Sequence, residues 1–245
     1  MVKISIIIPT LNEEKYLERL LKSIKNQNFK DYEIIISDSK SKDNTIKIAK
    51  RYGAKIVIGE KKGPGHGRNL GAEKAKGKYL LFIDADIILQ EKNTLSNVIE
   101  ILEIENVSGG TALFKCFDGN KKEKRWVNIS SKIFEFLIKL KISVALGFFI
   151  FTRKELFEKV GGFDEELPFC EDHKLIKKLK KFGKMKVIDS KILISSRRLR
   201  NMGFFKTLKI YIFSTVAYII SEDYLKKKFK FVSSTTIENN KRKKK

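Results

Sequence analysis

Two aspartates, Asp84 and Asp86, follow an unbroken run of five apolar and aromatic residues, Tyr79–Ile83. Such a run is typical of a strand that is buried on both faces of a sheet. Carboxylates this close repel each other more strongly as the dielectric constant falls, so the pair favours a bound counter-ion. Hard divalent cations such as Mg2+ and Mn2+ prefer oxygen ligands and often keep substrate phosphates as further ligands. The pattern predicts a metal site, although Asp-x-Asp also occurs in plain turns after strands.

Further polar residues fall where other predicted strands end. The first predicted strand, residues 4–8, is ended by Pro9, and the second covers residues 33–37. Strands and helices alternate through this part of the chain, which predicts a parallel sheet. In such sheets the ligand lies at the carboxyl ends of the strands. Five polar residues occupy such positions: Thr10, Asn12, Asp38, Asp84 and Asp86.

Capping patterns and periodicity predict the remaining elements. Acidic residues Glu13 and Glu14 suit the first turn of a helix capped by Thr10 or Asn12. A capping box at 152–155 predicts the start of a later helix. The other expected elements are strands at 55–58, 107–117, 146–151, 186–188 and 192–195, and helices at 93–105 and 127–140.

The chain of 245 residues is long enough for one large α/β domain, and its 52 basic and 29 acidic side chains give a net charge of +23. Residues 197–245 hold 14 basic and 3 acidic residues, which is +11 of that charge. This concentration predicts an anionic partner: membrane headgroups, nucleic acid or a phosphorylated substrate. Two cysteines, Cys116 and Cys170, and an N-terminus unlike a signal peptide indicate a reduced, cytoplasmic setting.

An apolar segment near the C-terminus has basic residues on both sides. Its uninterrupted part, residues 210–220, is about half of the roughly 20 residues that a membrane-spanning helix needs. A helix that lies in the membrane interface fits this segment better, and a helix packed on the core is the alternative. The predicted organisation is a catalytic domain at 1–200, an amphipathic helical region at 201–232 and a disordered basic tail at 233–245.

Several short motifs occur in one order along residues 3–225: Ser5–Glu13, Asp38, Gly67–Gly71, Asp84–Asp86, Gly161–Asp164, Glu171–Asp172 and Arg197–Arg198. Together they resemble the family 2 glycosyltransferases of the GT-A fold. The resemblance implies a single Rossmann-like mixed α/β sheet flanked by helices, here with a C-terminal amphipathic helical extension. It also implies an inverting transfer of a sugar from a UDP-, GDP- or dTDP-linked donor, with Mn2+ or Mg2+ as the cation.

The resemblance assigns roles on the donor side. It implies that Asp38 accepts a hydrogen bond from a ring nitrogen of the base and that Arg68 approaches the base or the diphosphate. The acceptor is a hydroxyl or phosphate of unknown identity, and a polyprenyl-linked acceptor suits an enzyme docked on the inner face of the cell membrane. The residues expected to hold the base and ribose are Pro9, Thr10, Leu11 and Glu13.

The same resemblance assigns the reacting end of the site. Asp86 is expected to bind the metal directly, and Asp84 to contact the ribose and the metal. Asp172 is expected to be the general base that takes the acceptor proton. Arg197 and Arg198 are expected to clamp the diphosphate, since guanidinium groups bind phosphate in a bidentate way.

The chain departs from the family pattern in two places. Lys174 stands where many relatives have an acid, and Ser39 and Lys40 stand where small residues or glycine are common. Two other functions are alternatives. A sugar-phosphate nucleotidyltransferase would carry a glycine-rich loop directly after the first strand, where this chain has Pro9–Glu13. A non-catalytic protein that binds nucleic acid fits the charge, but the sequence contains no recognisable nucleic-acid module.

Overall fold

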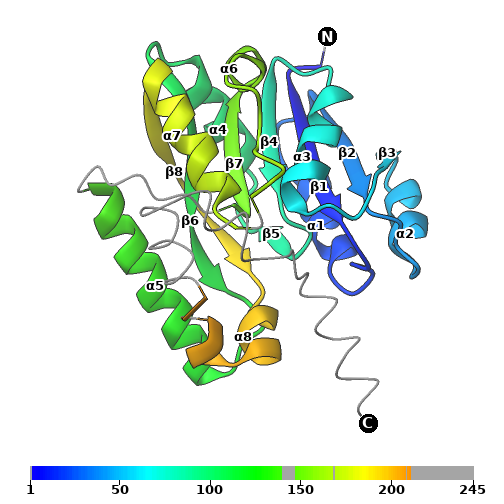
Figure 1. The fold of residues 1–245 in the computed structure, drawn as a ribbon, viewed down its shortest axis with the longest axis vertical. Helices are drawn as coiled ribbons and strands as arrows, with labels where there is room; N and C mark the ends of the chain where they lie inside the picture. The colour runs from blue at the N-terminus through cyan, green and yellow to red at the C-terminus, as the bar shows by residue number, and fades with distance from the viewer. Residues whose placement is uncertain (1, 140–146, 168, 208, 211–245) are drawn as a thin grey trace.

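The protein folds around one mixed β-sheet (Figure 1). A computed structural model describes residues 2–139, 147–167, 169–207 and 209–210, and these include eight strands in the order β3-β2-β1-β4-β7-β6-β8-β5. The strands are β1 Ile4–Thr10, β2 Tyr32–Asp38, β3 Lys55–Ile58, β4 Tyr79–Ile83, β5 Ile87–Leu89, β6 Val107–Cys116, β7 Phe149–Arg153 and β8 Lys184–Ile194. The helices are α1 Leu17–Lys25, α2 Thr45–Arg51, α3 Pro64–Glu73, α4 Thr94–Glu103, α5 Lys121–Lys139, α6 Lys154–Lys159, α7 Glu171–Leu179 and α8 Arg197–Met202. The predicted single mixed sheet flanked by helices is confirmed.

The first half of the sheet is parallel, as the alternation of strands and helices predicted. Strands β3, β2, β1 and β4 run in one direction, and Thr10 lies opposite Asp38 at the carboxyl end of β1 and β2. The predicted end of β1 at Pro9 is wrong, because the strand continues to Thr10. Among the described strands, β1 pairs only with β2 beyond Ile7, so a residue without an N–H group is tolerated there.

Two apolar layers hold the helices on the sheet. Neighbouring side chains of a strand point to opposite faces. Ile6 and Ile8 therefore belong to the layer with α1, α2 and α4, whereas Ile7 belongs to the layer with α3, α6 and α7. Strand β4 is buried along its whole length, as its apolar run predicted. The acidic residues that follow β4 are thereby fixed at the edge of the sheet.

The second half of the sheet mixes strand directions. Strand β7 is antiparallel to β4 and β6, and β8 is parallel to β6 and antiparallel to β5. The two short strands predicted at 186–188 and 192–195 are in fact one strand, β8. The register shifts where Ala112 and Phe114 of β6 pair with Ile188 and Ile192 of β8. Three β8 residues, 189–191, lie opposite one β6 residue there, and the pairing continues past them.

The first helix begins later than its capping pattern indicated. It starts at Leu17, so Glu13 and Glu14 lie before its first turn and neither Thr10 nor Asn12 caps it. Thr10 is still part of β1, and Asn12 has a left-handed backbone with φ of 56°. The chain therefore has to turn before a helix can begin. As a result the Glu13 side chain is available for contacts at the strand ends.

Two other helix starts differ from the prediction. Thr152 caps no helix: it lies in β7, and its hydroxyl donates to the Ser108 carbonyl at 2.7 Å. Helix α5 begins well before its predicted start because Asn120 and Glu123 cap it reciprocally. The Glu123 N–H donates to Asn120 Oδ1 at 2.9 Å, and the Asn120 N–H donates to Glu123 Oε2 at 3.1 Å.

The C-terminal part of the prediction falls largely outside the described residues. Residues 204–207 are helical, whereas nearly all of the apolar run at 210–220 is not described. The division into parts at 1–200, 201–232 and 233–245 therefore stays a prediction. None of the helices within the described ranges combines the length and the apolar character that crossing a membrane requires.

Candidate active site at the carboxyl edge of the sheet

Asp38 is the last residue of β2, lies opposite Thr10 of β1 and is only 1% exposed. Its carboxylate accepts hydrogen bonds from Thr10 Oγ1 at 2.8 Å, from Ser41 N at 2.7 Å and from Ser41 Oγ at 2.5 Å. Lys40, with φ of 61°, bends the loop so that Ser41 returns to the carboxylate. The carboxylate thus keeps acceptor capacity for one further donor.

Arg197, the first residue of α8, joins the acids that follow β1 and β4. Its Nη1 donates to Glu13 Oε2 at 2.5 Å, and its Nε lies 2.7 Å from Asp86 Oδ2. The Glu13 and Asp86 side chains are 9% and 16% exposed, so both carboxylates are largely removed from water. The guanidinium also lies over the Tyr16 ring, 4.9 Å from its centroid. One guanidinium therefore bridges two carboxylates at the strand ends.

Arg68 in α3 forms a second bridge between acids. Its side chain is buried, and Nη1 donates to Glu171 Oε1 at 2.8 Å. Nη2 donates to Asp84 Oδ1 at 2.9 Å and to the Gly147 carbonyl at 2.7 Å. Within the described residues Nε has no hydrogen-bond partner. Arg68 thus connects the end of β4 with the start of α7.

Glycines allow α3 to lie directly on β1. A Cβ at Gly71 would lie 2.4 Å from Ile7 Cγ2, and one at Gly67 would lie 3.2 Å from Pro9 Cβ. The two elements therefore approach more closely than larger residues would permit. This close approach carries Arg68 to the strand ends.

Asp172 is the second residue of α7 and is half-buried. Its Oδ1 accepts a hydrogen bond from the His173 N–H at 2.8 Å. A Cβ at Gly147 would lie 2.8 Å from its Oδ2, so the Gly147 backbone passes directly beside this carboxylate. Because Gly147 also binds Arg68, Asp172 lies next to the group formed by Arg68, Glu171 and Asp84.

These groups follow one another along a single edge. Ser41 Oγ, which binds Asp38, also accepts from the Asn12 N–H at 2.8 Å and so ties the β2 loop to the loop that holds Glu13. Arg198 is exposed next to Arg197, Leu11 is half-buried in the first loop, and Pro9 pairs with Ser37 inside the sheet. The predicted site residues that lie along the edge are Thr10, Glu13, Asp38, Arg68, Asp84, Asp86, Asp172 and Arg197.

Burial makes these acids hold protons more tightly than usual. It raises the pKa of Glu13 to about 7, against the opposing charge of Arg197. Burial and the nearby charge of Asp172 raise the pKa of Glu171 to about 7, against the opposing charge of Arg68. The pKa of Asp86 is raised by burial as well, again against Arg197. The charged form of these buried carboxyls therefore depends on a nearby cation.

Two acidic residues of this region received no role from the sequence. The sequence marks Glu171 only as the neighbour of Asp172, although it is the residue that binds Arg68. Asp118, after β6, accepts from Ser195 Oγ at 2.7 Å, from Ser196 N at 2.8 Å and from Arg200 Nη2 at 2.8 Å. It therefore fixes the start of α8. An aspartate in a turn carries no sequence signal for such distant partners.

Comparison with known proteins agrees with this geometry. Residues 5–161, well over half of the chain, match Glycosyl transferase family 2. The chain belongs to this family. The matched region includes β1, β2, β4 and β7 and therefore most of the edge described above.

Two curated relatives of this glycosyltransferase match shorter stretches. It is 33% identical over 111 residues to the poly(ribitol-phosphate) beta-N-acetylglucosaminyltransferase TarS of Staphylococcus aureus, covering 42% of this chain and 19% of TarS. It is 39% identical over 93 residues to the GalNAc(5)-diNAcBac-PP-undecaprenol beta-1,3-glucosyltransferase of Campylobacter jejuni, covering 35% of this chain and 30% of that enzyme. The glycosyltransferase thus spans less than a third of the length of either relative.

A solved structure resembles the glycosyltransferase along most of its length. The mannosyltransferase PcManGT from Pyrobaculum calidifontis, in complex with GDP-Man and Mn2+, matches with a TM-score of 0.64 at 18% identity, covering 97% of this chain and 68% of PcManGT. At this identity the likeness concerns the fold alone, and it confirms the predicted GT-A architecture.

The carboxylates of the glycosyltransferase fit a divalent cation that takes its remaining ligands from the substrate. Asp84 and Asp86 offer carboxylate oxygens. Burial raises the pKa of Asp86, and a cation bound beside it would favour its charged form. Among the described residues, no three His, Cys, Asp or Glu side chains converge as a complete metal site. A cation that keeps phosphate and water ligands suits such a partial set.

Proposed function

We propose that this glycosyltransferase moves a sugar from a nucleotide-sugar donor to an acceptor with inversion, depends on Mn2+ or Mg2+, and works at a membrane surface. The observation that carries the proposal is the row of carboxylates at the sheet edge, held together by Arg68 and Arg197. Family membership favours this interpretation over a nucleotidyltransferase or a non-catalytic nucleic-acid-binding protein.

In the proposed mechanism, Thr10, Leu11, Glu13 and Asp38 hold the nucleoside beside Pro9 at the ends of β1 and β2. Arg197 and Arg198 bind the diphosphate, for which a guanidinium group offers paired donors. Because Arg197 already contacts Asp86, an anionic donor that draws Arg197 away would free a carboxylate oxygen of Asp86. Asp84 and Asp86 would hold the divalent cation, which would neutralise charge on the leaving diphosphate.

Asp172 is proposed as the general base. Inversion needs a base on the face of the sugar opposite the leaving group. Asp172 is half-buried at the edge beside Gly147, so it is proposed to take the acceptor proton next to the group formed by Arg68, Glu171 and Asp84. Arg68 holds Glu171 and Asp84 in place and so positions the residues on either side of the sugar.

The acceptor is proposed to be lipid-linked and presented at the inner face of the cell membrane. The relative from Campylobacter jejuni is named for a PP-undecaprenol acceptor, and TarS is named for a poly(ribitol-phosphate) acceptor. The net charge of +23 suits an anionic membrane surface.

Thermal unfolding with a panel of UDP-, GDP- and dTDP-sugars, each with and without Mn2+, tests the donor and the metal together. A ligand raises the midpoint of unfolding as its concentration exceeds its dissociation constant. We expect one nucleotide class to raise the midpoint, and to do so mainly with Mn2+ present. No response to any nucleotide sugar, with or without metal, would refute the proposed function.

A further inference from the structure

Helix α5 carries a second apolar face that the sheet does not cover. Among its described side chains, Val127 and Phe134 are buried with the core. Four other large apolar side chains of the helix remain in solvent: Trp126 is 42% exposed, Ile129 37%, Ile133 54% and Phe136 60%. A surface helix normally turns such residues toward the core and polar residues outward.

The exposed apolar residues of α5 form a continuous stripe. Their spacing of three, four and three positions places them within an arc of about 80° around a helix of 3.6 residues per turn. The stripe extends beyond the helix, because the Trp126 ring stacks on Phe204 with centroids 4.2 Å apart and Phe205 is 83% exposed. We call this surface the apolar stripe and define it as Trp126, Ile129, Ile133, Phe136 and Phe205.

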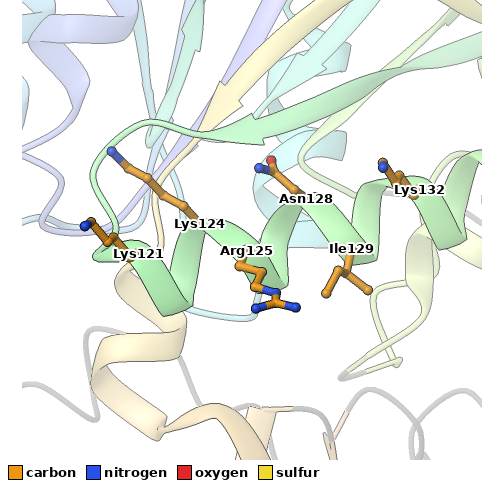
Figure 2. Close-up of a pocket in the computed structure, with 6 residues that line it drawn as sticks. All are labelled: Lys121, Lys124, Arg125, Asn128, Ile129 and Lys132. Atoms are coloured by element: carbon orange, nitrogen blue, oxygen red, sulfur yellow. The ribbon is translucent and has the colours of Figure 1, made fainter.

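A band of basic residues runs along the same helix beside the apolar stripe. It consists of Lys121, Lys124, Arg125 and Lys132, all of which are exposed. With Asn128 and Ile129 they line a shallow hollow of about 450 Å³ on the surface of α5 (Figure 2). Ile129 belongs to both surfaces, so the basic band and the apolar stripe are continuous with each other.

We infer that α5 and Phe205 dock this protein on a bilayer that contains anionic lipids. An apolar stripe next to a basic band is the pattern of a helix that lies in the membrane interface. The stripe enters the boundary between headgroups and acyl chains, and the basic band contacts the negative headgroups. The inference deepens the membrane part of the proposed function and locates it on described residues.

Other occupants match this surface less well. A second copy of the chain would bring two equal basic bands together, which like-charge repulsion opposes. A nucleic acid would use the basic band but leave the apolar stripe in water, so the exposed apolar area would not be removed from solvent. A bilayer of anionic lipids satisfies both the charge and the apolar side chains.

The chain contains a single tryptophan, Trp126, which lies inside the apolar stripe and reports on docking directly. The full chain is mixed with vesicles of phosphatidylcholine alone or with added phosphatidylglycerol, and binding is followed by sedimentation. Lipids with brominated acyl chains then test whether Trp126 reaches the acyl region. We expect binding only with phosphatidylglycerol, with a blue shift and bromine quenching of the tryptophan emission.

Two variants and two matched controls test the surface. The stripe variant combines Ile129→Ser, Ile133→Ser and Phe136→Ser, and its control makes the same kind of change at the exposed residues Ile58, Ile104 and Phe182. The basic variant changes the four residues of the band to Gln, and its control changes Lys25, Lys47, Lys50 and Lys74, which are exposed elsewhere. Each basic residue near an anionic surface contributes about fivefold to partitioning. The apolar side chains contribute by leaving water for the interface. We therefore expect each variant to bind at least about tenfold more weakly than its control.

Several outcomes would overturn the inference. Vesicle binding without quenching of Trp126, or equal binding by the stripe variant and its control, would show that another surface docks. A dimer that the stripe variant breaks, or binding to single-stranded RNA in place of vesicles, would identify a different occupant. If the stripe variant does not fold, the quenching of wild-type Trp126 still decides the question.

Nucleoside diphosphate binding in solution is measured on the same variants, so loss of docking is separable from failure of the proposed transferase function.

Discussion

At the scale of single residues, two arginines organise the acids of the site. Arg197 binds Glu13 and Asp86, and Arg68 binds Asp84 and Glu171. Buried carboxylates without such partners would be costly, since removing one member of a buried ion pair leaves an uncompensated charge. Each arginine is therefore a structural bridge between acids that lie far apart in the sequence.

Exchanging two aspartates for asparagine separates the proposed roles. Asp172→Asn removes a base but no proposed donor or metal contact, so we expect kcat to fall by at least about 100-fold with donor affinity kept. Asp86→Asn removes a proposed metal ligand, so we expect the Mn2+-dependent part of nucleoside diphosphate affinity to disappear. Steady-state kinetics and titration calorimetry measure the two effects. Normal turnover by either variant would contradict the role given to that residue.

The pKa of Glu171 predicts a pH-dependent contribution to stability. Burial raises this pKa from 4.5 to about 7, with Asp172 adding to the shift. Between these values the folded protein binds more protons at this site than the unfolded chain, so the free energy of unfolding falls as pH rises.

Glu171→Gln removes that titration. From pH 5 to pH 8 we expect the free energy of unfolding of the variant to gain roughly 2–3 kcal/mol relative to wild type. Urea unfolding in the presence of EDTA at several pH values measures the difference. Glu166→Gln, at an exposed acid nearby, is the matched control. A difference that does not change with pH would rule out the raised pKa.

At the scale of elements, the short helix α8 reaches the site because the turn before α5 holds its start. Asp118 accepts hydrogen bonds from Ser195, from the Ser196 backbone and from Arg200. The Arg197 N–H in turn donates to Ser195 Oγ at 3.1 Å. Asp118 is therefore a positioning residue for Arg197, and it couples α5 to the active-site edge.

Asp118→Asn tests this coupling. Hydrogen bonds to charged groups contribute roughly 1.5–3 kcal/mol each, so loosening α8 should weaken nucleoside diphosphate binding several-fold. The effect should vanish when Arg197 is already Ala, because no guanidinium is left to position. Asp189→Asn, at an exposed aspartate of β8, controls for the loss of charge. Additive effects of Asp118→Asn and Arg197→Ala on affinity would mean that Asp118 does not act through Arg197.

At the scale of the whole molecule, burial is uneven. Helix α1 has five buried residues, Leu17, Leu20, Leu21, Ser23 and Ile24, and lies on the parallel half of the sheet. In the longer α5, two of the described side chains, Val127 and Phe134, are buried. Figure 1 shows α5 and α8 at the periphery of the sheet. Local opening requires less free energy where fewer apolar contacts are lost.

Hydrogen exchange should reveal this gradient. We expect backbone amides of α5 to exchange with solvent well before those of α1, β1 and β4, since α5 can detach without breaking the sheet. Mass spectrometry of peptides from the exchanged protein measures the order. Equal protection of α5 and α1 in the absence of lipid would contradict the expectation.

The sequence by itself determined the central sheet and the position of its acids. Apolar runs such as Tyr79–Ile83 can only be buried on both faces, and parallel strands place the residues that follow them at one edge. Asp38, Asp84 and Asp86 therefore had to lie at the same edge of the sheet, whatever their exact partners. The ordered motifs also placed the chain correctly in its family.

Only the tertiary structure decided which arginine binds which carboxylate and which part of the surface stays exposed. Arg197 and Glu13 are 184 positions apart, and Arg68 and Glu171 are 103 apart, so no local pattern relates them. The start of α1 likewise depended on the left-handed turn at Asn12, and the exposure of Ile133 depended on how far the sheet extends under α5. Local propensity specifies strands and helices, whereas contacts between distant residues exist only once the whole sheet has formed.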